Sequence, residues 1–311
     1  MLDVRRLRIL VAVADYGSFT AAALHLHLTQ SAVSQQMALL EREAHVGLVD
    51  RQPRGVQLTP AGELLVERTR ELLGMLANIE GELHELRAGP APVRLGTFPT
   101  AGANLIPLAL RQFRQRCPDG EVIVSPVRSS EPIGQMLRDG ELHIGLVWDY
   151  DIVPRPAESG LEETHLLDDP LHVVVPAQHP LAGAGQLNLE DLADEAWIVR
   201  DHRPPNHQAF ETMCRIAGFE PHVVFRTDDY QSAQGLVAAG IGVCLMPTLA
   251  FSGLRPDIAV LPLGQPAFHR RIMAISLREG LRSVTDQALL RVLVETARTL
   301  VADREGPTAE S

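Results

Sequence analysis

The sequence predicts a chain in which a small helical domain with a two-stranded hairpin precedes a larger α/β region. Three observations predict this class. Apolar residues recur at helical spacing within the first 45 residues. One uninterrupted helical pattern then covers residues 60–88. Beyond residue 92, short apolar runs alternate with helical segments, an order typical of a parallel α/β sheet.

Three short helices are expected at the N-terminus. The first carries one apolar stripe and stops at Gly17, since glycine readily ends a helix. Ser18 and Thr29 have the side chains that cap the next two helices. The predicted helices cover residues 4–14, 19–26 and 30–43.

The third helix has two contrasting faces. Val33, Met37 and Leu40 lie on the inner face at spacings of four and three residues. The opposite face is short, polar and nearly uncharged. A recognition helix must fit a DNA major groove about 12 Å wide, and such a face meets that need.

Residues 48–51 and 56–58 are expected to pair as a two-stranded wing, with Pro53 and Gly55 in the turn. Two helices, a tight turn and a wing form a winged helix-turn-helix, predicted over residues 1–59. Glutamine can bond an adenine edge, serine a phosphate, and wing arginines the adjacent backbone or minor groove. Duplex DNA is therefore an expected partner, with candidate contacts Gln30, Ser31, Ser34, Gln35, Arg51 and Arg54.

The net charge of −11 at first sight argues against DNA binding. Its distribution matters more than the total. Residues 1–59 hold six arginines and five acidic residues, so the acidic excess lies beyond them. The predicted DNA-binding domain is thus not electrostatically repelled by phosphate.

A long helix is predicted to begin at Pro60, after the capping Thr59, and to end at Gly89-Pro90. Leucine or isoleucine recurs every seven residues, as in a coiled-coil seam roughly 43 Å long. Gly74 and Gly81 weaken the helix when it is isolated, so we expect a partner helix. Packing of the helix on its own domain is the alternative. The seam residues are Leu65, Leu72, Ile79 and Leu86, with Thr69, Leu76 and Leu83 between them.

The remaining chain alternates predicted strands with predicted helices. The strands are 93–96, 121–127, 142–147, 171–175, 198–199, 223–226, 241–246 and 271–276. The helices are 101–116, 132–138, 207–217, 230–239 and 285–302. Residues 305–311 are expected to form a polar tail.

The N-terminal pattern resembles that of the LysR-type transcriptional regulators. It reads Leu7, Gly17-Ser18-Phe19-Thr20, Ala22-Ala23, Leu26, Gln30, Ala32-Val33-Ser34, Gln36, Leu40-Glu41, Gly47, Arg51, Leu58-Thr59 and Ala61-Gly62. The resemblance continues through His179-Pro180-Leu181-Ala182 and Gly240-Ile241-Gly242. Ser31, Val49 and His143 stand where the family usually has proline, phenylalanine and aspartate.

The resemblance implies a transcription regulator whose effector domain has two α/β lobes, as in periplasmic solute-binding proteins, with a small molecule between them. Lobe I would comprise residues 92–161 and 266–304, and lobe II residues 162–265, after a linker helix at 60–89. It also implies a homo-oligomer, dimer or tetramer, paired through helix 60–88. A solute-binding protein or an enzyme on the same two-lobed fold is the alternative, but the first 60 residues show neither a secretion signal nor a catalytic motif.

Ligands of α/β folds bind beyond the carboxyl ends of the strands. Hydroxyls and free amides at helix N-termini favour an anion there, and an Arg or His facing the cleft suits a carboxylate. An organic acid is the expected effector. The alternatives are that Thr100 and Ser130 only cap helices and that Arg200 and His202 lie on a solvated loop. The candidate effector residues are Thr97, Thr100, Ser129, Ser130, Arg200, His202 and Thr227.

The sequence also sets several negative expectations. Cys117, Cys214 and Cys244 are few and far apart, which argues against a disulfide framework, and Cys244 is expected to be buried. No apolar run is long enough for a membrane span, so a cytoplasmic location is expected. Neither metal-ligand spacing nor a nucleotide motif was found, and we expect no cofactor and no catalytic residues.

Overall fold

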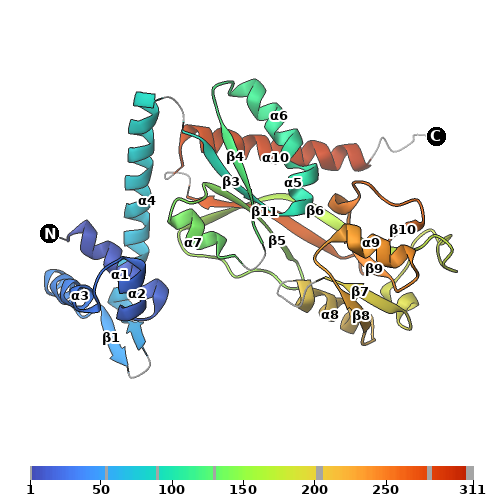
Figure 1. Ribbon diagram of the computed structural model, residues 1–311, viewed down its shortest axis with the longest axis horizontal. Helices are drawn as coiled ribbons and strands as arrows, with labels where there is room; N and C mark the ends of the chain where they lie inside the picture. Colours follow the sequence, from blue (N-terminus) through green and yellow to red (C-terminus); the bar gives the residue numbers. More distant parts are fainter. Residues whose placement is uncertain are drawn as a thin grey trace. The chain divides into compact units, whose positions relative to one another are not determined.

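The computed structural model describes residues 2–52, 55–88, 91–128, 131–200, 206–278 and 282–305. It divides into two compact units, each described by itself (Figure 1). The first contains residues up to 88 with 158–160 and 277–283, and the second contains the remainder.

Three helices form the N-terminal domain as predicted: α1 (Val4–Tyr16), α2 (Phe19–His25) and α3 (Gln30–Ala44). Gly17 ends α1 with a φ of 64°, a left-handed conformation that glycine adopts without steric cost. The predicted caps are confirmed, because Ser18 accepts from the amide of Ala21 and Thr29 from that of Ala32. Each side chain satisfies an amide that would otherwise lack a partner.

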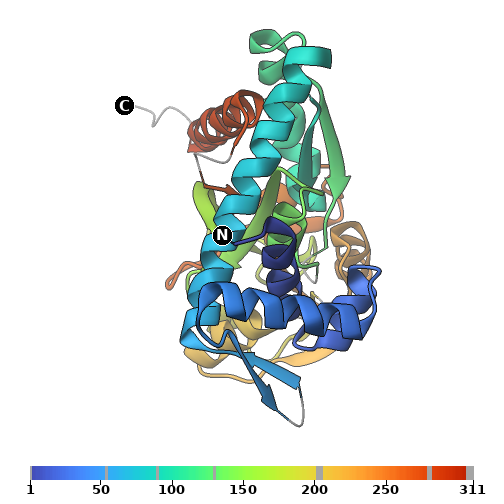
Figure 2. The ribbon, with the colours of Figure 1, turned by 90° about the vertical axis from the view of Figure 1, so that its left-hand side faces the viewer.

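The wing consists of β1 (Val49–Gln52) and β2 (Gly55–Leu58), which pair antiparallel. Figure 2 shows this hairpin projecting beyond the three helices. Its base is attached to α3, since the Glu41 carboxylate accepts from the amides of Leu48 at 2.9 Å and Val49 at 3.3 Å. The wing is therefore held in a defined position relative to α3.

Helix α4 (Pro60–Ala88) follows the wing, as predicted. Thr59 caps it by accepting from the amide of Gly62 at 3.1 Å. A Cβ at Gly62 would lie 2.0 Å from the carbonyl oxygen of Leu48, so only glycine permits this approach of helix to wing. Val66 and Thr69 are buried, whereas Leu72, Met75, Ile79 and Leu83 further along the helix are exposed.

The second unit is built on a seven-stranded sheet of order β10-β6-β11-β5-β3-β4, with β9 also paired to β6. Two further strands, β7 (Ala196–Val199) and β8 (His222–Arg226), pair parallel in a separate sheet. The strands of the large sheet are β3 (Val93–Thr97), β4 (Val122–Pro126), β5 (Ile144–Tyr150), β6 (Leu161–Pro176), β9 (Cys244–Pro247), β10 (Ile258–Pro262) and β11 (His269–Leu277).

The prediction of a parallel sheet is only partly correct. Strand β3 runs parallel to β4 and β5, but β11 runs antiparallel to β5, and β6 runs antiparallel to β9 and β10. Strand β6 starts ten residues before the predicted strand and carries the chain from the β3–β5 region to the β9–β10 region. A strand that crosses between the two parts of the sheet can run antiparallel to its neighbours.

The predicted helix 101–116 is in fact two helices, α5 (Pro99–Asn104) and α6 (Ile106–Arg116). Pro107 explains the break, because its ring nitrogen cannot donate the hydrogen bond that would continue α5. The break lets the short helix α5 turn separately from α6.

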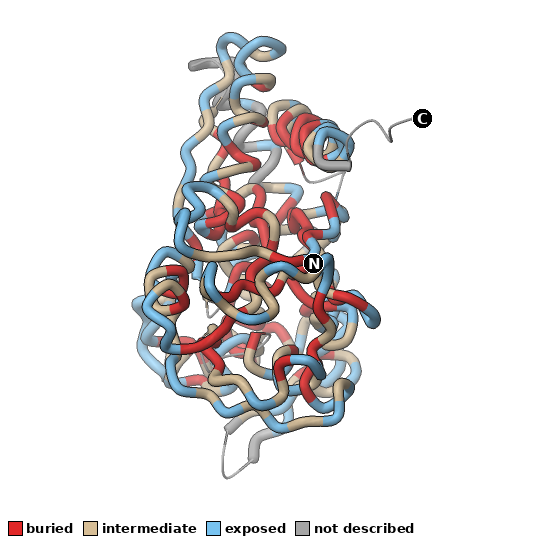
Figure 3. Tube along the Cα trace, turned by 90° about the vertical axis from the view of Figure 1, so that its right-hand side faces the viewer, coloured by how far each residue is buried: buried red, intermediate tan, exposed pale blue. Residues whose placement is uncertain are grey.

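Helices cover both faces of the sheet. Helices α6 and α10 (Val284–Glu305) pack together over one face, while α7 (Ile133–Arg138) packs against β5 (Figure 1). Strand residues alternate accordingly: Leu146 joins the core under α6 and α10, and Val147 the cluster beneath α7. Figure 3 shows that α10 carries both buried and exposed residues along its length.

Strands β7 and β8 border two hydrophobic clusters. Trp197 and Val199 belong to the core under α6 and α10, and Ile198 belongs to a second cluster. Helices α8 (Asn206–Ile216) and α9 (Tyr230–Ala238) flank these strands. Two short 3-10 helices, η1 (Leu189–Leu192) and η2 (Thr248–Ala250), lie in the same region. Val237 of α9 packs with Val174 of β6 and Met246 of β9. Strand β6 is thus shared by both halves of the second unit.

Across the described ranges, no single helix is long and apolar enough to cross a bilayer. Helices α1 and α2 would meet that criterion only as a pair bent by 117°.

Candidate DNA-binding and effector sites

Helix α3 has the two faces that the sequence predicts. Val33 is fully buried and Met37 is 1% exposed, both within the core of the N-terminal domain. Gln30, Ser31 and Gln35 are exposed on the other side, and Ser34 is half-buried beside them. The polar face is therefore open to solvent while the apolar face fixes the orientation of the helix.

Specific contacts hold α3 in place. The guanidinium of Arg6 on α1 donates to Oε1 of Gln36 at 3.1 Å and forms an ion pair with Glu43. At the start of α3, the hydroxyls of Thr29 and Ser31 lie 3.0 Å apart. Ser31 thus contributes to the cap as well as to the exposed face.

The wing arginines are only partly described. Arg51 lies in β1 opposite Val56 of β2, but its side chain is outside the described residues, as is the whole of Arg54. Both remain predicted contacts to the DNA backbone.

The predicted effector hydroxyls at the end of β3 are buried. Thr97 is 5% exposed, and the hydroxyl of Thr100 accepts from Nη2 of Arg270 at 2.7 Å. Thr100 is therefore already engaged within the protein, and its role as an effector contact remains a prediction. Ser129, Ser130 and His202 fall outside the described residues.

Arg270 is the centre of a buried cluster that sequence reasoning missed. Arg270 of β11 is 1% exposed, and its Nε donates to Oδ2 of Asp169 at 2.8 Å. Oδ1 of Asp169 accepts from the amide of Leu249 at 3.0 Å. The cluster joins strands β6 and β11 to α5 and η2. No local sequence pattern predicts this cluster, because about 100 residues separate the two charges in the chain.

Thr227 favours the capping interpretation. Its hydroxyl accepts from the amide of Asp229 at 3.1 Å. Asp229 in turn caps α9, accepting from the amides of Gln231 and Ser232. The hydrogen bond from the Ser232 hydroxyl leads the contacts that lower the pKa of Asp229. These contacts account for Thr227 without a ligand.

Arg200 is the predicted effector residue with the most distinctive surroundings. It follows β7, and its guanidinium carbon lies 5.8 Å from the ring centre of Trp148 and 4.9 Å from that of Tyr230. Burial is the largest single influence and lowers the pKa of Arg200. The charge interaction and the hydrogen bond with Tyr230, with smaller contributions from Tyr150 and Asp228, together outweigh burial, so the pKa lies above its ordinary value. Arg200 is therefore a cation placed between two aromatic faces.

A small cavity of about 40 Å³ adjoins Arg200. Asn206, which begins α8, was missed by sequence reasoning and borders this cavity. Its Oδ1 accepts from Nε1 of Trp148 at 3.1 Å and from the Tyr150 hydroxyl at 3.2 Å. The lining residues are Tyr150, Leu171, Ile198, Val199, Arg200, Asn206, Phe210, Met213, Tyr230 and Leu245.

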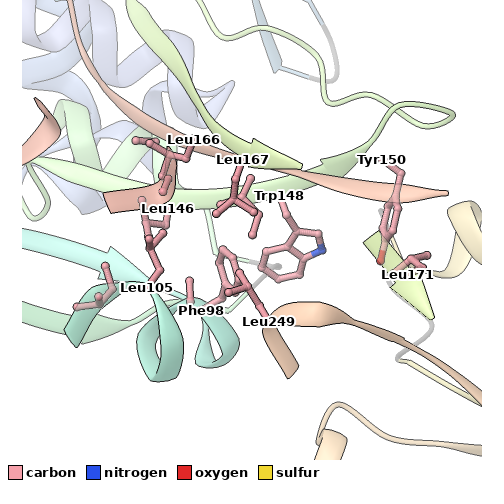
Figure 4. Close-up of a cluster of buried hydrophobic side chains, with 14 of the residues drawn as sticks. Phe98, Leu105, Leu146, Trp148, Tyr150, Leu166, Leu167, Leu171 and Leu249 are labelled. Atoms are coloured by element: carbon pink, nitrogen blue, oxygen red, sulfur yellow. The ribbon is translucent and has the colours of Figure 1, made fainter. Parts of the chain in front are cut away.

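Trp148 and Tyr150 are two residues apart on β5 and project from the same face (Figure 4). Phe98 packs edge-on against Trp148, with ring centres 4.6 Å apart. Burial, the largest influence, raises the pKa of the Tyr150 hydroxyl above its ordinary value, so this group stays a donor at neutral pH. A second hollow of about 240 Å³ is also bordered by Trp148, together with Arg128, Arg155 and Gln208.

The cysteines have different surroundings. Cys244 is 2% exposed, as predicted, and Cys214 is fully buried. Burial raises the pKa of each of these two thiols to about 12, so neither is a thiolate at neutral pH. Cys117 is half-buried at the end of α6.

Comparison with known proteins gives one family for both regions. The model of the bacterial regulatory helix-turn-helix proteins of the lysR family matches residues 4–63, and that of the LysR substrate binding domain matches residues 89–298. The HTH-type transcriptional regulator AlsR of Bacillus subtilis (strain 168) is 30% identical over 85% of this chain and 86% of its own length.

Solved structures agree. Full-length BenM is 26% identical, with a TM-score of 0.59 and coverage of 100% of both chains. Full-length CbnR, solved in complex with its target DNA, is 24% identical with a TM-score of 0.56, covering 95% of this chain and 100% of the other.

A winged helix-turn-helix joined to a two-lobed ligand-binding domain defines a DNA-binding regulator that carries its own sensor. The chain belongs to the LysR family of transcriptional regulators. It is a regulator and not an enzyme.

Proposed function

We propose that α3 enters the major groove of its operator and reads bases through Gln30 and Gln35, with Ser31 and Ser34 contacting phosphate. Arg51 and Arg54 of the wing would bind the adjacent backbone or minor groove. The observation that carries this proposal is the exposed polar face of α3 opposite the fully buried Val33. Its test is binding to the DNA upstream of the protein's own gene, at stated salt.

We propose further that the regulator forms a homo-oligomer through α4. Leu72, Ile79 and Leu83, three members of the predicted seam, are 39%, 50% and 61% exposed in the single chain. Apolar side chains along one helix gain most by packing on a second copy. A dimer or tetramer would place paired α3 helices about 10 base pairs apart, or at a multiple of that spacing. Because its DNA target is there, the regulator would act in the cytoplasm.

The effector is proposed to be a small organic acid bound between lobe I (residues 92–161 and 266–304) and lobe II (residues 162–265). The cationic Arg200 beside a cavity with mostly apolar lining supports an anion with an apolar body. Effector binding would change the angle between the lobes and thereby the promoter output.

A thermal-shift comparison tests the effector class. The full-length protein is heated with a panel of carboxylic acids and, separately, with the matching neutral amides. We expect at least one carboxylate to raise Tm, because only ligands that bind the folded state stabilise it. Stabilisation by amides alone would contradict an anionic effector.

A further inference from the structure

Asn206 joins helix α8 to strand β5 through one oxygen atom. Its Oδ1 accepts both the indole N–H of Trp148, at 3.1 Å, and the hydroxyl of Tyr150, at 3.2 Å. Asn206 is 6% exposed, so water does not compete for these donors. Two donors from one strand thus converge on a single neutral acceptor.

A cation lies beside this contact. The guanidinium of Arg200 faces the ring of Trp148, and its Nε is buried without a hydrogen-bond partner among the described residues. A buried donor without an acceptor is energetically unfavourable, the more so on a charged group. The amide of Asn206 cannot neutralise this charge. The cavity next to it is lined by Arg200, Tyr150 and Asn206 as well as by apolar side chains.

An indole N–H and a phenolic O–H that meet at one atom, with a guanidinium lining the same cavity, form a receptor for a carboxylate, whose charged oxygens bind such donors more strongly than a neutral amide does. We propose that Oδ1 of Asn206 occupies the place of the effector's carboxylate, and that the effector binds by displacing Asn206 from Trp148 and Tyr150. This inference rests on the proposed anionic effector and assigns its headgroup to particular residues.

The remaining lining indicates the rest of the ligand. Phe210, Met213 and Leu245 border the cavity, so the body of the acid is apolar. The cavity is small, and displacement of the Asn206 side chain enlarges it. Displacement also releases α8 from β5, so effector occupancy and the position of α8 are coupled. Asn206 therefore acts as a latch that a small apolar monocarboxylate opens.

The substitution Asn206→Asp tests whether this position accepts negative charge, without any knowledge of the effector. The new carboxylate has nearly the same shape as the amide. We expect the Tm of the full-length protein at pH 7 to rise by about 2–4 °C. Pairing with Arg200 lowers the folded-state pKa of the new carboxyl, so the gain is present above pH about 4 and disappears as the pH falls further.

Two further variants test whether pairing with Arg200 causes the expected rise in Tm. Gln208→Glu adds the same charge to the same first turn of α8 at an exposed position that borders the second hollow, so it measures the effect of the helix dipole together with the solvent-screened attraction of Arg128 and Arg155. We expect it to change Tm by less than about 1 °C. Adding Arg200→Gln to Asn206→Asp should abolish the gain. A lower Tm for Asn206→Asp at pH 7, with a deficit that shrinks toward pH 4, would overturn the proposal.

Asn206→Ala provides a binding measurement in case the charged variant does not fold. Isovalerate, a small branched carboxylate, is titrated calorimetrically into the wild type and into this variant, with isovaleramide as the neutral control. We expect the variant to bind isovalerate about tenfold more tightly, because the ligand no longer competes with the amide, and isovaleramide to bind equally to both. Equal, weaker or undetectable isovalerate binding by the variant contradicts the proposal. If carboxylates raise the Tm of the wild type but Asn206→Asp lowers it, the proposal of an anionic effector stands. In that case only the proposed carboxylate site at Trp148, Tyr150 and Arg200 is contradicted.

Discussion

Asp169 and Arg270 form a buried ion pair between residues that are far apart in the chain. Both charges are almost fully buried, and their partners are Thr100 and the amide of Leu249. A buried ion pair is weak evidence for net stability, but removal of one partner leaves the other charge uncompensated. The stability of the folded protein around β6 and β11 therefore depends on the presence of both Asp169 and Arg270.

Replacement of Asp169 with Asn should lower the free energy of unfolding by about 3–5 kcal/mol. Urea denaturation of the full-length protein measures this change. Asp168→Asn is the matched control, because the Asp168 side chain is 54% exposed and its described partner is the surface residue His165. We expect the control to stay within about 0.5 kcal/mol of the wild type. Equal effects of the two variants would show that the buried pair does not hold the crossover.

The residues of this cluster and of the cavity beside Arg200 also show where sequence reasoning ends. Arg200 was predicted because it directly follows an apolar strand. Asn206, Asp169 and Arg270 were not, since their partners lie far away in the chain and meet only after folding. Thr100 was predicted from its position, yet its hydroxyl is bound to Arg270.

At the scale of elements, caps and turns carry most of the predictable information. Ser18, Thr29 and Thr59 mark helix starts that the structure confirms. The prediction failed where tertiary contacts decide. The first part of β6 contains Glu162, Glu163 and Asp168 and lacks a regular apolar alternation, so pairing with neighbouring strands, not local pattern, makes it a strand.

Asp229 offers a pH-dependent test of one such cap. Replacement with alanine should cost about 0.5–2 kcal/mol of unfolding free energy at pH 7, because α9 loses the acceptor for two backbone amides. The folded-state pKa of Asp229 is lowered, so its contribution exists above the unfolded pKa of about 3.9 and is lost as the pH falls through the folded value.

Denaturation at pH 7 and at pH 3 measures the difference between wild type and Asp229→Ala. Asp119→Ala, which changes an exposed aspartate outside any cap, serves as the control and should be nearly neutral at both pH values. A deficit of Asp229→Ala that is equal at pH 3 and pH 7 would assign the effect to something other than the carboxylate cap.

For the whole molecule, the proposed assembly through α4 explains why apolar side chains of this helix are exposed in the single chain. The exposed seam side chains predict that Ile79→Glu shifts the protein toward smaller species, because a charge at the centre of an apolar seam is costly to bury. Light scattering coupled to size-exclusion chromatography measures the mass. Val284→Glu replaces an apolar residue that is 74% exposed on α10 and should leave the mass unchanged. An unchanged mass for Ile79→Glu would refute pairing through this seam.

The most direct test of the account is DNA binding by the polar face of α3. Fluorescence anisotropy with DNA from upstream of the gene compares the wild type, Gln35→Ala and the matched control Gln115→Ala, an exposed glutamine on α6. If Gln35 reads a base, its loss costs about 1–3 kcal/mol, roughly a 5- to 150-fold weaker affinity, with an unchanged salt dependence. The control should bind as the wild type does. Equal affinities of all three proteins, or no binding by the wild type at low salt, would contradict the central claim.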